Sequence, residues 1–275
     1  MQTSSIQVRP LRFAIDGSIP RHWHPRGAAV TTFFNNLSIF FPEGERFFIR
    51  CVRAHAGAVK DERLLADVRS FCGQEAIHGR EHVRYNEWVR EQGYPLDALL
   101  ERVATELRRK PADRRGLAIT CALEHFTALM GQVALEDSRI LDGAHPVMAA
   151  LWRWHAAEEN EHKAVAYDVY VAAGGRYTER VVVMAAVTGL FWAHVIGHQV
   201  RLMKADGIAF DVGEWAALFR FLFVEPGGLT RVFRRYWAYF RPDFHPNDVE
   251  SKPLVDAWKT RSDTLAALSG ALESP

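Results

Sequence analysis

A nine-residue stretch, Trp154 to His162, constrains the fold of this chain more than any other, because it holds two histidines and three glutamates. On an α-helix of 3.6 residues per turn, His155, Glu159 and His162 occupy positions i, i+4 and i+7 and project from one stripe. One helix could therefore present three ligands to a single site. Glu158 and Glu161 lie on a stripe rotated by roughly a quarter turn, at about 100° per residue, and are less suited to the same ion.

The Glu-x-x-His spacing of Glu159 and His162 occurs a second time, at Glu75 and His78. Di-iron and di-manganese bundles use two Glu-x-x-His helices and one further glutamate from each of two other helices. Glu45 precedes the first motif and Glu124 precedes the second, each among apolar residues. The intervals leave room for one helix to end and an antiparallel helix to return. The pattern therefore predicts two helical hairpins that face each other.

No segment alternates with period two over more than a few residues, so we predict an all-α chain: a four-helix bundle with additional C-terminal helices. The expected divisions are an N-terminal arm over 1–27, a metal-binding bundle over 28–175 and a C-terminal helical part over 176–275 that packs on it. Within the bundle we expect a short helix before Pro42 and a connecting helix over 97–110. The four ligand helices are expected at 42–57, 61–92, 113–138 and 146–174.

The C-terminal part carries two unusual segments. Residues 181–196 are almost entirely apolar, but sixteen residues fall short of the ~20 needed to span a bilayer, so we expect a buried helix packed on the bundle. Aromatic residues and arginines interleave over 219–244, which favours a helical pair that covers the bundle. An amphipathic element that binds a membrane surface or a partner stays the alternative for this segment.

The composition fits a globular protein, with 48% hydrophobic and 24% charged residues. A net charge of +1 gives no reason to expect a nucleic-acid partner. Residues 1–25 have no apolar core of a signal peptide, so we expect a cytoplasmic location. The three cysteines lack any Cys-x-x-Cys spacing and are expected as buried thiols, not as a disulfide framework or a zinc ribbon.

The candidate ligands form a mixed oxygen and nitrogen donor set. Such donors suit iron or manganese better than metals that prefer thiolates, and open coordination positions favour O₂ chemistry. His82 lies one turn beyond His78 and is a candidate proton relay, spare ligand or hydrogen-bonded histidine. The metal-ligand candidates are Glu45, Glu75, His78, Glu124, His155, Glu159 and His162.

Four short segments give the chain a resemblance to known proteins. They are Phe-Pro-Glu-Gly-Glu-Arg-Phe-Phe at 41–48, Gln-Glu-x-x-His-x-x-x-His at 74–82, Glu-Glu-x-Glu-His-Lys at 158–163 and Phe-His-Pro at 244–246. Over about residues 30–250 the chain resembles the ferritin-like di-iron carboxylate proteins. More narrowly, it is similar to the bacterial family of predicted metal-dependent hydrolases. The resemblance implies a ferritin-like four-helix bundle around two metal ions.

A further likeness concerns the stripe of His155, Glu159 and His162. Its order, His-x-x-x-Glu-x-x-His, resembles the p-aminobenzoate N-oxygenase group, in which the extra histidine gives one iron a second imidazole. This implies that His155 is a seventh ligand and favours an oxygenase over a hydrolase. Gln74 and Glu158 match positions that hydrogen-bond a ligand histidine in related di-iron oxygenases, where the residue is usually Asp.

We therefore expect a non-haem di-iron oxygenase or oxidase that activates O₂ and oxidises a small apolar or aromatic molecule. Two iron ions, or manganese or mixed iron and manganese, would be the cofactors, and O₂ the co-substrate. Electrons would come from an external donor protein or reductant, because the chain has no flavin or nicotinamide fingerprint. A homodimer stays open. The alternatives are a dinuclear hydrolase of an ester or amide, and a metal-binding protein without catalysis.

Overall fold

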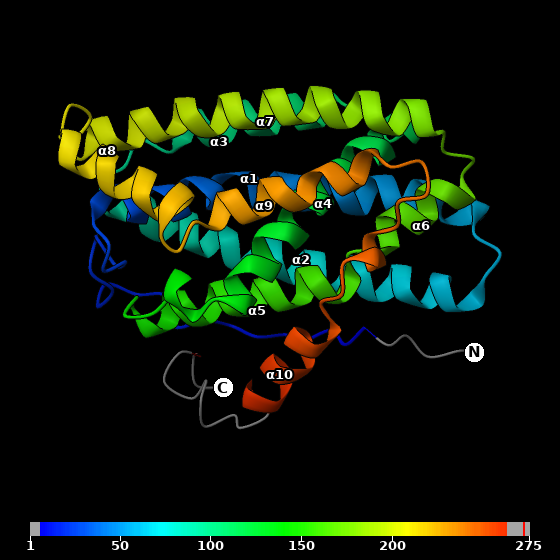
Figure 1. Cartoon of the computed structure of the whole chain (residues 1–275), viewed down its shortest axis with the longest axis horizontal. Coiled ribbons are helices and arrows are strands. Elements are labelled where there is room, and N and C mark those ends of the chain that lie inside the picture. The colour runs from blue at the N-terminus through cyan, green and yellow to red at the C-terminus, as the bar shows by residue number, and fades with distance from the viewer. Residues whose placement is uncertain (1–5, 263–271, 273–275) are drawn as a thin grey trace.

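The described residues of the chain, 6–262 and 272 in this computed structural model, form a packed bundle of helices (Figure 1). Over these residues there is no β-strand, and a single isolated bridge pairs Phe13 with Leu272. The prediction of an all-α fold is confirmed.

Two helical hairpins make up the ligand-bearing bundle. The first pairs α1 (Ala28–His55) with α2 (Glu62–Glu91), and the second pairs α4 (Arg114–Glu136) with α5 (Pro146–His162). Helix α3 (Asp97–Arg108) connects the hairpins and packs on α1. The starts of α2 and α4 are capped by aspartates, since the Asp61 carboxylate accepts from the Arg63 N–H and that of Asp113 from the Gly116 N–H. Pro146 occupies the first turn of α5.

Helix α1 runs without interruption through Pro42, so the predicted start of a new helix at this proline is wrong. A proline inside a helix leaves the carbonyl four residues earlier without its N–H partner. In the structure, the Ser38 carbonyl accepts a hydrogen bond from Asn86 Nδ2 at 3.0 Å. Because a side chain of α2 replaces the lost bond, the helix continues and Glu45 lies well inside it.

The fourth ligand helix ends earlier than predicted. Helix α5 stops at His162, a short turn follows, and α6 (Val165–Ala172) begins, whereas the sequence predicts one helix to 174. The two residues of the turn, a lysine and an alanine, both favour helix, so their helix propensity does not predict a break here. Lys163 is buried, and its ammonium group contacts the Val249 carbonyl and, at 2.8 Å, the Ser251 hydroxyl. The turn thus coincides with a tertiary contact to the C-terminal segment.

The N-terminal arm from residue 6 onward is irregular but lies against the bundle. Phe13, Ile19 and Trp23 are almost fully buried. The Phe13 ring lies 5.3 Å from that of Trp154, between centroids, and the Trp23 indole donates to Asn35 of α1. The arm therefore forms part of the hydrophobic core. All three cysteines are buried and unpaired, as predicted.

The C-terminal part adds a layer over α1 and α4 (Figure 1). It begins with the long helix α7 (Tyr177–Ala205) and continues through α8 (Val212–Phe219) into a π-helical segment, η3 (Arg220–Val224). Helix α9 (Gly228–Tyr236) then packs on α4, and α10 (Lys252–Ser262) contacts α4 and α5. Short 3₁₀ segments complete the chain: η1 (Ala56–Ala58), η2 (Ser138–Ile140), η4 (Trp237–Phe240) and η5 (Pro246–Asp248).

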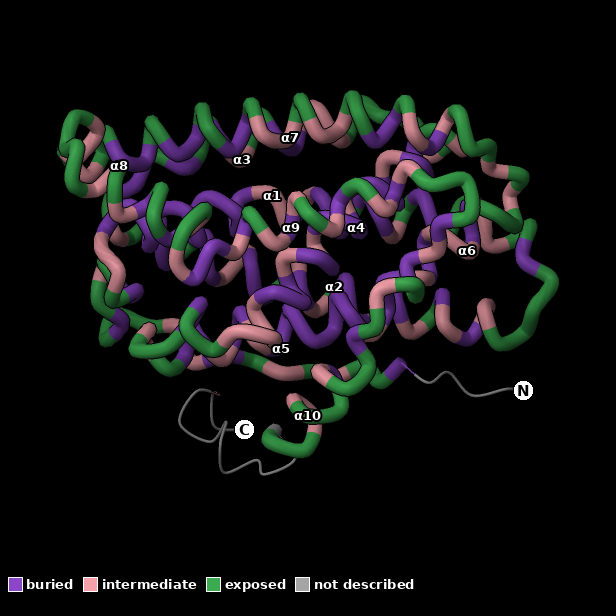
Figure 2. The backbone as a smooth tube through the Cα atoms, in the orientation of Figure 1, coloured by how far each residue is buried: buried purple, intermediate pink, exposed green. Residues whose placement is uncertain are grey.

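The prediction of a buried helix over 181–196 is wrong for one side of α7. The inner side packs on α1 and α4, but the outer side is exposed (Figure 2), with Val182 65% and Ile196 61% exposed. The length argument also fails, because the helix has 29 residues. Among the described helices, α4 and α7 are long and apolar enough to cross a membrane, with 72% and 28% of their most apolar windows buried.

Candidate metal centre

Seven side chains from the four ligand helices meet in the middle of the bundle. Helix α1 supplies one, α2 two, α4 one and α5 three, and each of them is 3% exposed or less. They are the seven residues that the sequence nominates as metal ligands: Glu45, Glu75, His78, Glu124, His155, Glu159 and His162. Six of them form two groups of three, within each of which the potential ligand atoms lie within 4.8 Å of one another.

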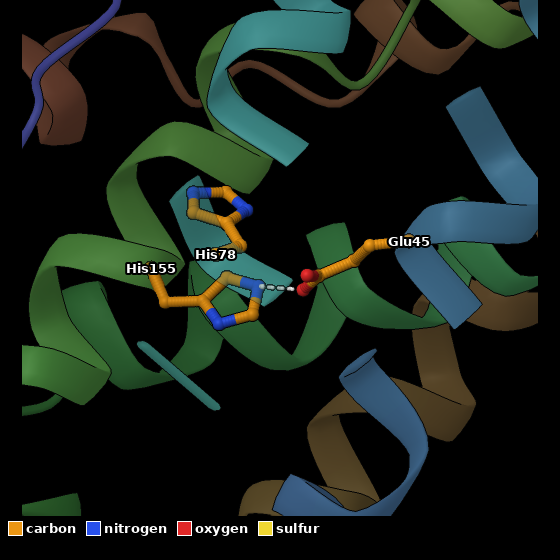
Figure 3. Close-up of side chains that lie close together, drawn as sticks. All are labelled: Glu45, His78 and His155. Atoms are coloured by element: carbon orange, nitrogen blue, oxygen red, sulfur yellow. Dashed lines mark ion pairs between the residues drawn. The ribbon is translucent and has the colours of Figure 1, made fainter. Parts of the chain in front are cut away.

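The first group consists of Glu45, His78 and His155 (Figure 3). Both imidazoles lie on one side and the glutamate approaches from α1. His155 Nε2 is 3.8 Å from Glu45 Oε1. This group is rich in nitrogen donors, with two imidazoles and one carboxylate.

The second group consists of Glu75, Glu159 and His162. His162 Nε2 is 3.2 Å from Glu75 Oε1. The seventh side chain, Glu124, belongs to neither group of three, but its Oε2 lies 3.4 Å from the same His162 nitrogen. This side of the centre is therefore rich in carboxylate donors.

The two glutamates of the Glu-x-x-His motifs belong to the second group but lie on its border with the first. Glu75 Oε1 is 3.7 Å from His78 Nδ1 in addition to its contact with His162. Glu159 Oε1 is 2.9 Å from His155 Nε2, 3.5 Å from His78 Nδ1 and 3.7 Å from His162 Nε2. Each of these glutamates therefore lies within 3.7 Å of histidines of both groups and would help to hold an ion in either.

Hydrogen bonds fix the orientation of the two motif histidines. His78 Nε2 lies 3.0 Å from Glu158 Oε2, and His162 Nδ1 lies 2.9 Å from Gln74 Oε1. Each imidazole therefore donates its outer N–H, and its other nitrogen faces the carboxylates, where it becomes a donor to a metal ion once its proton is lost. Gln74 and Glu158 are thus each within hydrogen-bond distance of one motif histidine.

His155 is held by a different chain of contacts. Its Nδ1 is 2.7 Å from His82 Nε2, and His82 Nδ1 is 2.9 Å from the Ser38 hydroxyl. If Nε2 of His155 faces the metal groups with its lone pair, Nδ1–H donates to His82 and His82 in turn donates to Ser38. His82 belongs to neither ligand group, and burial holds its pKa well below the usual value. It is therefore a neutral hydrogen-bond partner of His155.

An arginine from the N-terminal arm completes this outer layer. Arg9 donates to Glu158 at 2.8 Å and to Glu161 at 2.9 Å, and Gln74 Nε2 also donates to Glu161 at 2.8 Å. One cation thus links the supports of both motif histidines. The sequence gives no signal for Arg9, because it lies in an irregular segment 149 residues from Glu158.

Many polar atoms of the centre have no hydrogen-bond partner among the described residues. They include both carboxylate oxygens of Glu45, Glu75 and Glu124, one oxygen of Glu159, and the inward nitrogens of His78 and His162. A buried polar atom without a partner costs about 1–3 kcal/mol, and more if it is charged. Cations bound between these oxygen and nitrogen atoms would satisfy them, so the residues fit a dinuclear metal site.

Residues 7–250 match the family model described as "Predicted metal-dependent hydrolase". The chain belongs to this family. No curated protein and no solved structure matches the chain. The matched range contains every residue of the two ligand groups, together with Glu124 and Arg9.

In this member of the metal-dependent hydrolase family, the charges of the centre depend strongly on their surroundings. Burial raises the pKa of Glu45, Glu75 and Glu124, that of Glu124 to about 8, and neighbouring carboxylates add to the shift. Burial would also raise the pKa of Glu159, but the hydrogen bond from His155 and the nearby imidazoles of His162 and His78 hold it well below its usual value. The site therefore favours bound protons, with which a metal cation must compete.

For the two motif histidines, contacts with carboxylates outweigh the effect of burial on the pKa. Burial would lower their pKa, but contacts with carboxylates raise it well above the usual value, through Glu158 for His78 and Glu124 for His162. The pKa of His155 falls to about 4, because it is buried and lies beside His78. His155 is therefore neutral near pH 7 and available as a nitrogen donor.

A cavity of about 90 Å³, which we call the inner pocket, adjoins His155 and Glu159. The rest of its wall is almost entirely apolar. Part of it comes from α1 and α4, and part from η3 and α9, which roof it: Phe34, Phe41, Met130, Phe221, Leu229 and Val232. The C-terminal layer thus closes an apolar space beside the metal groups.

Two further buried histidines, His125 and His24, lie away from the centre. His125 packs against Tyr239 and Phe244, with ring centroids 4.9 and 5.2 Å away, and burial lowers its pKa to about 3. His24 is buried and its Nε2 is 2.9 Å from the Ile140 carbonyl. Neither belongs to a ligand group among the described residues.

Proposed function

We propose that this protein is a non-haem di-iron oxygenase or oxidase that acts on an apolar organic molecule. The observation that carries the proposal is the position of the two His/Glu groups beside an inner pocket with an apolar wall. A hydrolase needs polar groups that orient an ester or amide and admit water, and this wall offers few. An apolar space that excludes water suits oxidation of a hydrocarbon group.

Iron bound in both groups would supply activation of O₂ and transfer of electrons to it. The residues of the chain position the ions and leave room beside them. Glu75 and Glu159 lie on the border of the two groups, Glu158, Gln74 and His82 orient the imidazoles, and Glu45 and Glu124 complete the carboxylates. Manganese, or one ion of each metal, fits the same donors.

The proposed oxidation also requires an electron donor and a substrate. Oxidation with O₂ needs electrons, which we assign to an external donor protein or small reductant. We propose a cytoplasmic location, where such reductants are available. A small molecule is the substrate, and no nucleic acid is required.

Measurements of iron binding and of the reaction with O₂ test this proposal. The purified protein is loaded anaerobically with Fe(II), its metal content is measured, and absorbance is followed after mixing with O₂. We expect two irons per chain and a transient visible band whose decay depends on an added reductant. Stable binding of zinc in place of iron, with hydrolysis of esters and no reaction with O₂, would overturn it.

The family description favours a second candidate, a dinuclear metal-dependent hydrolase. Two metal ions held by these carboxylates and imidazoles would supply Lewis-acid activation of water for the hydrolysis of an ester or amide. Under this alternative, zinc- or manganese-loaded protein hydrolyses esters without O₂. The hydrolysis is then lost together with the metal in Glu159→Ala.

A further inference from the structure

A second, larger cavity opens on the side of the bundle covered by α7. It has a volume of about 550 Å³ and lies between α1, α3, α4 and α7. We call it the outer cleft. Most of its wall is apolar, and representative residues are Phe40, Phe48, Leu107, Leu123, Val187 and Phe191. Its volume falls within the roughly 300–1,000 Å³ of small-molecule pockets.

The outer cleft continues toward the metal centre. Four residues line both the outer cleft and the inner pocket: Leu37, Phe41, Thr127 and Met130. The inner pocket in turn is lined by His155 and Glu159. The two cavities are therefore neighbours, separated by the side chains that both share, and together they mark an apolar path from the surface beside α7 toward His155 of the nitrogen-rich group.

The other end of the outer cleft is basic. Arg109, Lys110 and Arg115 lie where α3 passes into α4, are exposed, and line the cleft. None of the three forms an ion pair with a described residue. The two acidic residues of the wall are already engaged, Glu106 with His194 and Arg102, and Asp113 with the start of α4. The basic end therefore presents net positive charge at the rim of an apolar cleft.

The distance between the two ends sets the shape of a ligand. Arg115 and Thr127 both lie on α4, twelve residues apart, which corresponds to about 18 Å along the helix at 1.5 Å per residue. A ligand that fills this path must be long, narrow and apolar. It must carry negative charge at one end, to complement the arginines and the lysine.

We propose that the outer cleft binds a long-chain alkyl carboxylate, with its carboxylate at Arg109, Lys110 and Arg115 and its chain directed along α4 toward the inner pocket. The inference rests on the proposed function only in taking this chain as the molecule that is oxidised; binding itself needs no metal. A single free chain is the occupant, because the inner pocket, at about 90 Å³, leaves no room for a second chain.

Neighbouring alanines of α7 provide a matched pair of variants for a test. Ala185 and Ala186 are both exposed, but only Ala186 lines the outer cleft. A tryptophan at 186 fills the cleft, whereas one at 185 lies outside it. In full-length protein titrated with dodecanoate below its micelle concentration, we expect Ala186→Trp to weaken binding at least 10-fold and Ala185→Trp to leave it within 2-fold.

A second pair of variants tests the basic end. Glutamines at Arg109, Lys110 and Arg115 remove three positive charges from the rim. The control replaces Lys60, Arg63 and Arg69, which are exposed on or near α2 and do not line the cleft, by glutamine. We expect the first triple variant to weaken dodecanoate at least 10-fold while dodecanol, which has the same chain without the charge, binds unchanged. The control should change neither ligand.

The outcomes separate this inference from the proposed function. Equal binding of dodecanoate by the parent, Ala186→Trp and the rim variant overturns the inference. A protein that binds vesicles of anionic phospholipid but no free dodecanoate also overturns it. Binding and the metal reaction are measured separately, so iron-dependent O₂ consumption without dodecanoate binding leaves the proposed function standing. Dodecanoate binding by a protein that never reacts with O₂ supports the cleft and removes the oxygenase.

Discussion

The two Glu-x-x-His motifs are alike in sequence but differ in what surrounds their histidines. His78 donates to the carboxylate of Glu158, which is paired with Arg9, whereas His162 donates to the neutral amide of Gln74. A carboxylate partner makes a ligand imidazole a stronger donor than an amide partner does. The first group also has a second imidazole, from His155, and the second has an extra carboxylate, from Glu124. The two motifs thus have the same sequence spacing but lie among different sets of nitrogen and oxygen donors.

Because their donor atoms differ, the two groups would hold their metal ions in different environments within one bundle. The nitrogen-rich group adjoins the inner pocket through His155, and the carboxylate-rich group lies closer to Glu124 on α4. Donor type tunes the preference of a metal site more than donor number does. We therefore expect substitutions to affect the two groups unequally, except at the glutamates that lie on their border.

The largest effect is expected from Glu159→Ala, because Glu159 contacts the histidines of both groups. Both ions should be lost, with affinity falling more than about 100-fold, beyond the 10–100-fold typical of losing an outer hydrogen-bond partner. Metal analysis after dialysis measures this. The exposed Glu87 serves as control, as Glu87→Ala. Retention of one ion at parent affinity would contradict the position of Glu159 on the border of the two groups.

A smaller and one-sided effect is expected from His155→Ala. The nitrogen-rich group should lose affinity and the other should keep its ion, because four carboxylates and two histidines stay in place. The bundle should stay folded, with a changed rate of the O₂ reaction. Titration with Fe(II) and stopped-flow absorbance measure both. If two ions bind as in the parent and react at the same rate, His155 is a packing residue.

The variant Glu158→Gln makes the supports of the two motif histidines alike. We expect the affinity of the nitrogen-rich group to fall about 10–100-fold, because His78 loses its anionic partner. The effect on the carboxylate-rich group should be slight. Competition with a coloured chelator measures the two affinities, with the exposed Glu101→Gln as control. Equal weakening of both ions would show that Arg9 couples the two supports too tightly to separate them.

The weakest of the expected effects is on pH dependence and concerns Glu124. Its pKa rises to about 8 from a usual 4.5, so the folded metal-free protein keeps a proton that the unfolded chain releases. The contribution to the free energy of unfolding is present in full below pH 4.5 and is lost as the pH rises through 8. Urea unfolding of chelator-treated protein across this range measures it. Glu124→Gln should flatten the slope, and an unchanged slope would assign it to other groups.

Much of the ligand set could be predicted from the sequence because helical spacing is local. His155, Glu159 and His162 share a stripe wherever the helix is regular, and α5 is regular up to His162. The lone glutamates Glu45 and Glu124 follow from the bundle pattern, because each of two facing hairpins must supply one more carboxylate. The continuation of α1 through Pro42 and the end of α5 at His162 were predicted less well, because each coincides with a contact to a distant residue, Asn86 or Ser251.

Periodicity along single helices indicated the helical class and the two Glu-x-x-His motifs with His155. The pattern of di-metal bundles added Glu45 and Glu124, and the resemblance to related oxygenases pointed to Gln74 and Glu158. Only the tertiary structure decided which ligands group together, that Arg9 links Glu158 with Glu161, and that α7 leaves a cleft leading toward the centre. These features depend on distances between segments far apart in the chain. Such distances are set by packing of whole helices, which no local pattern records.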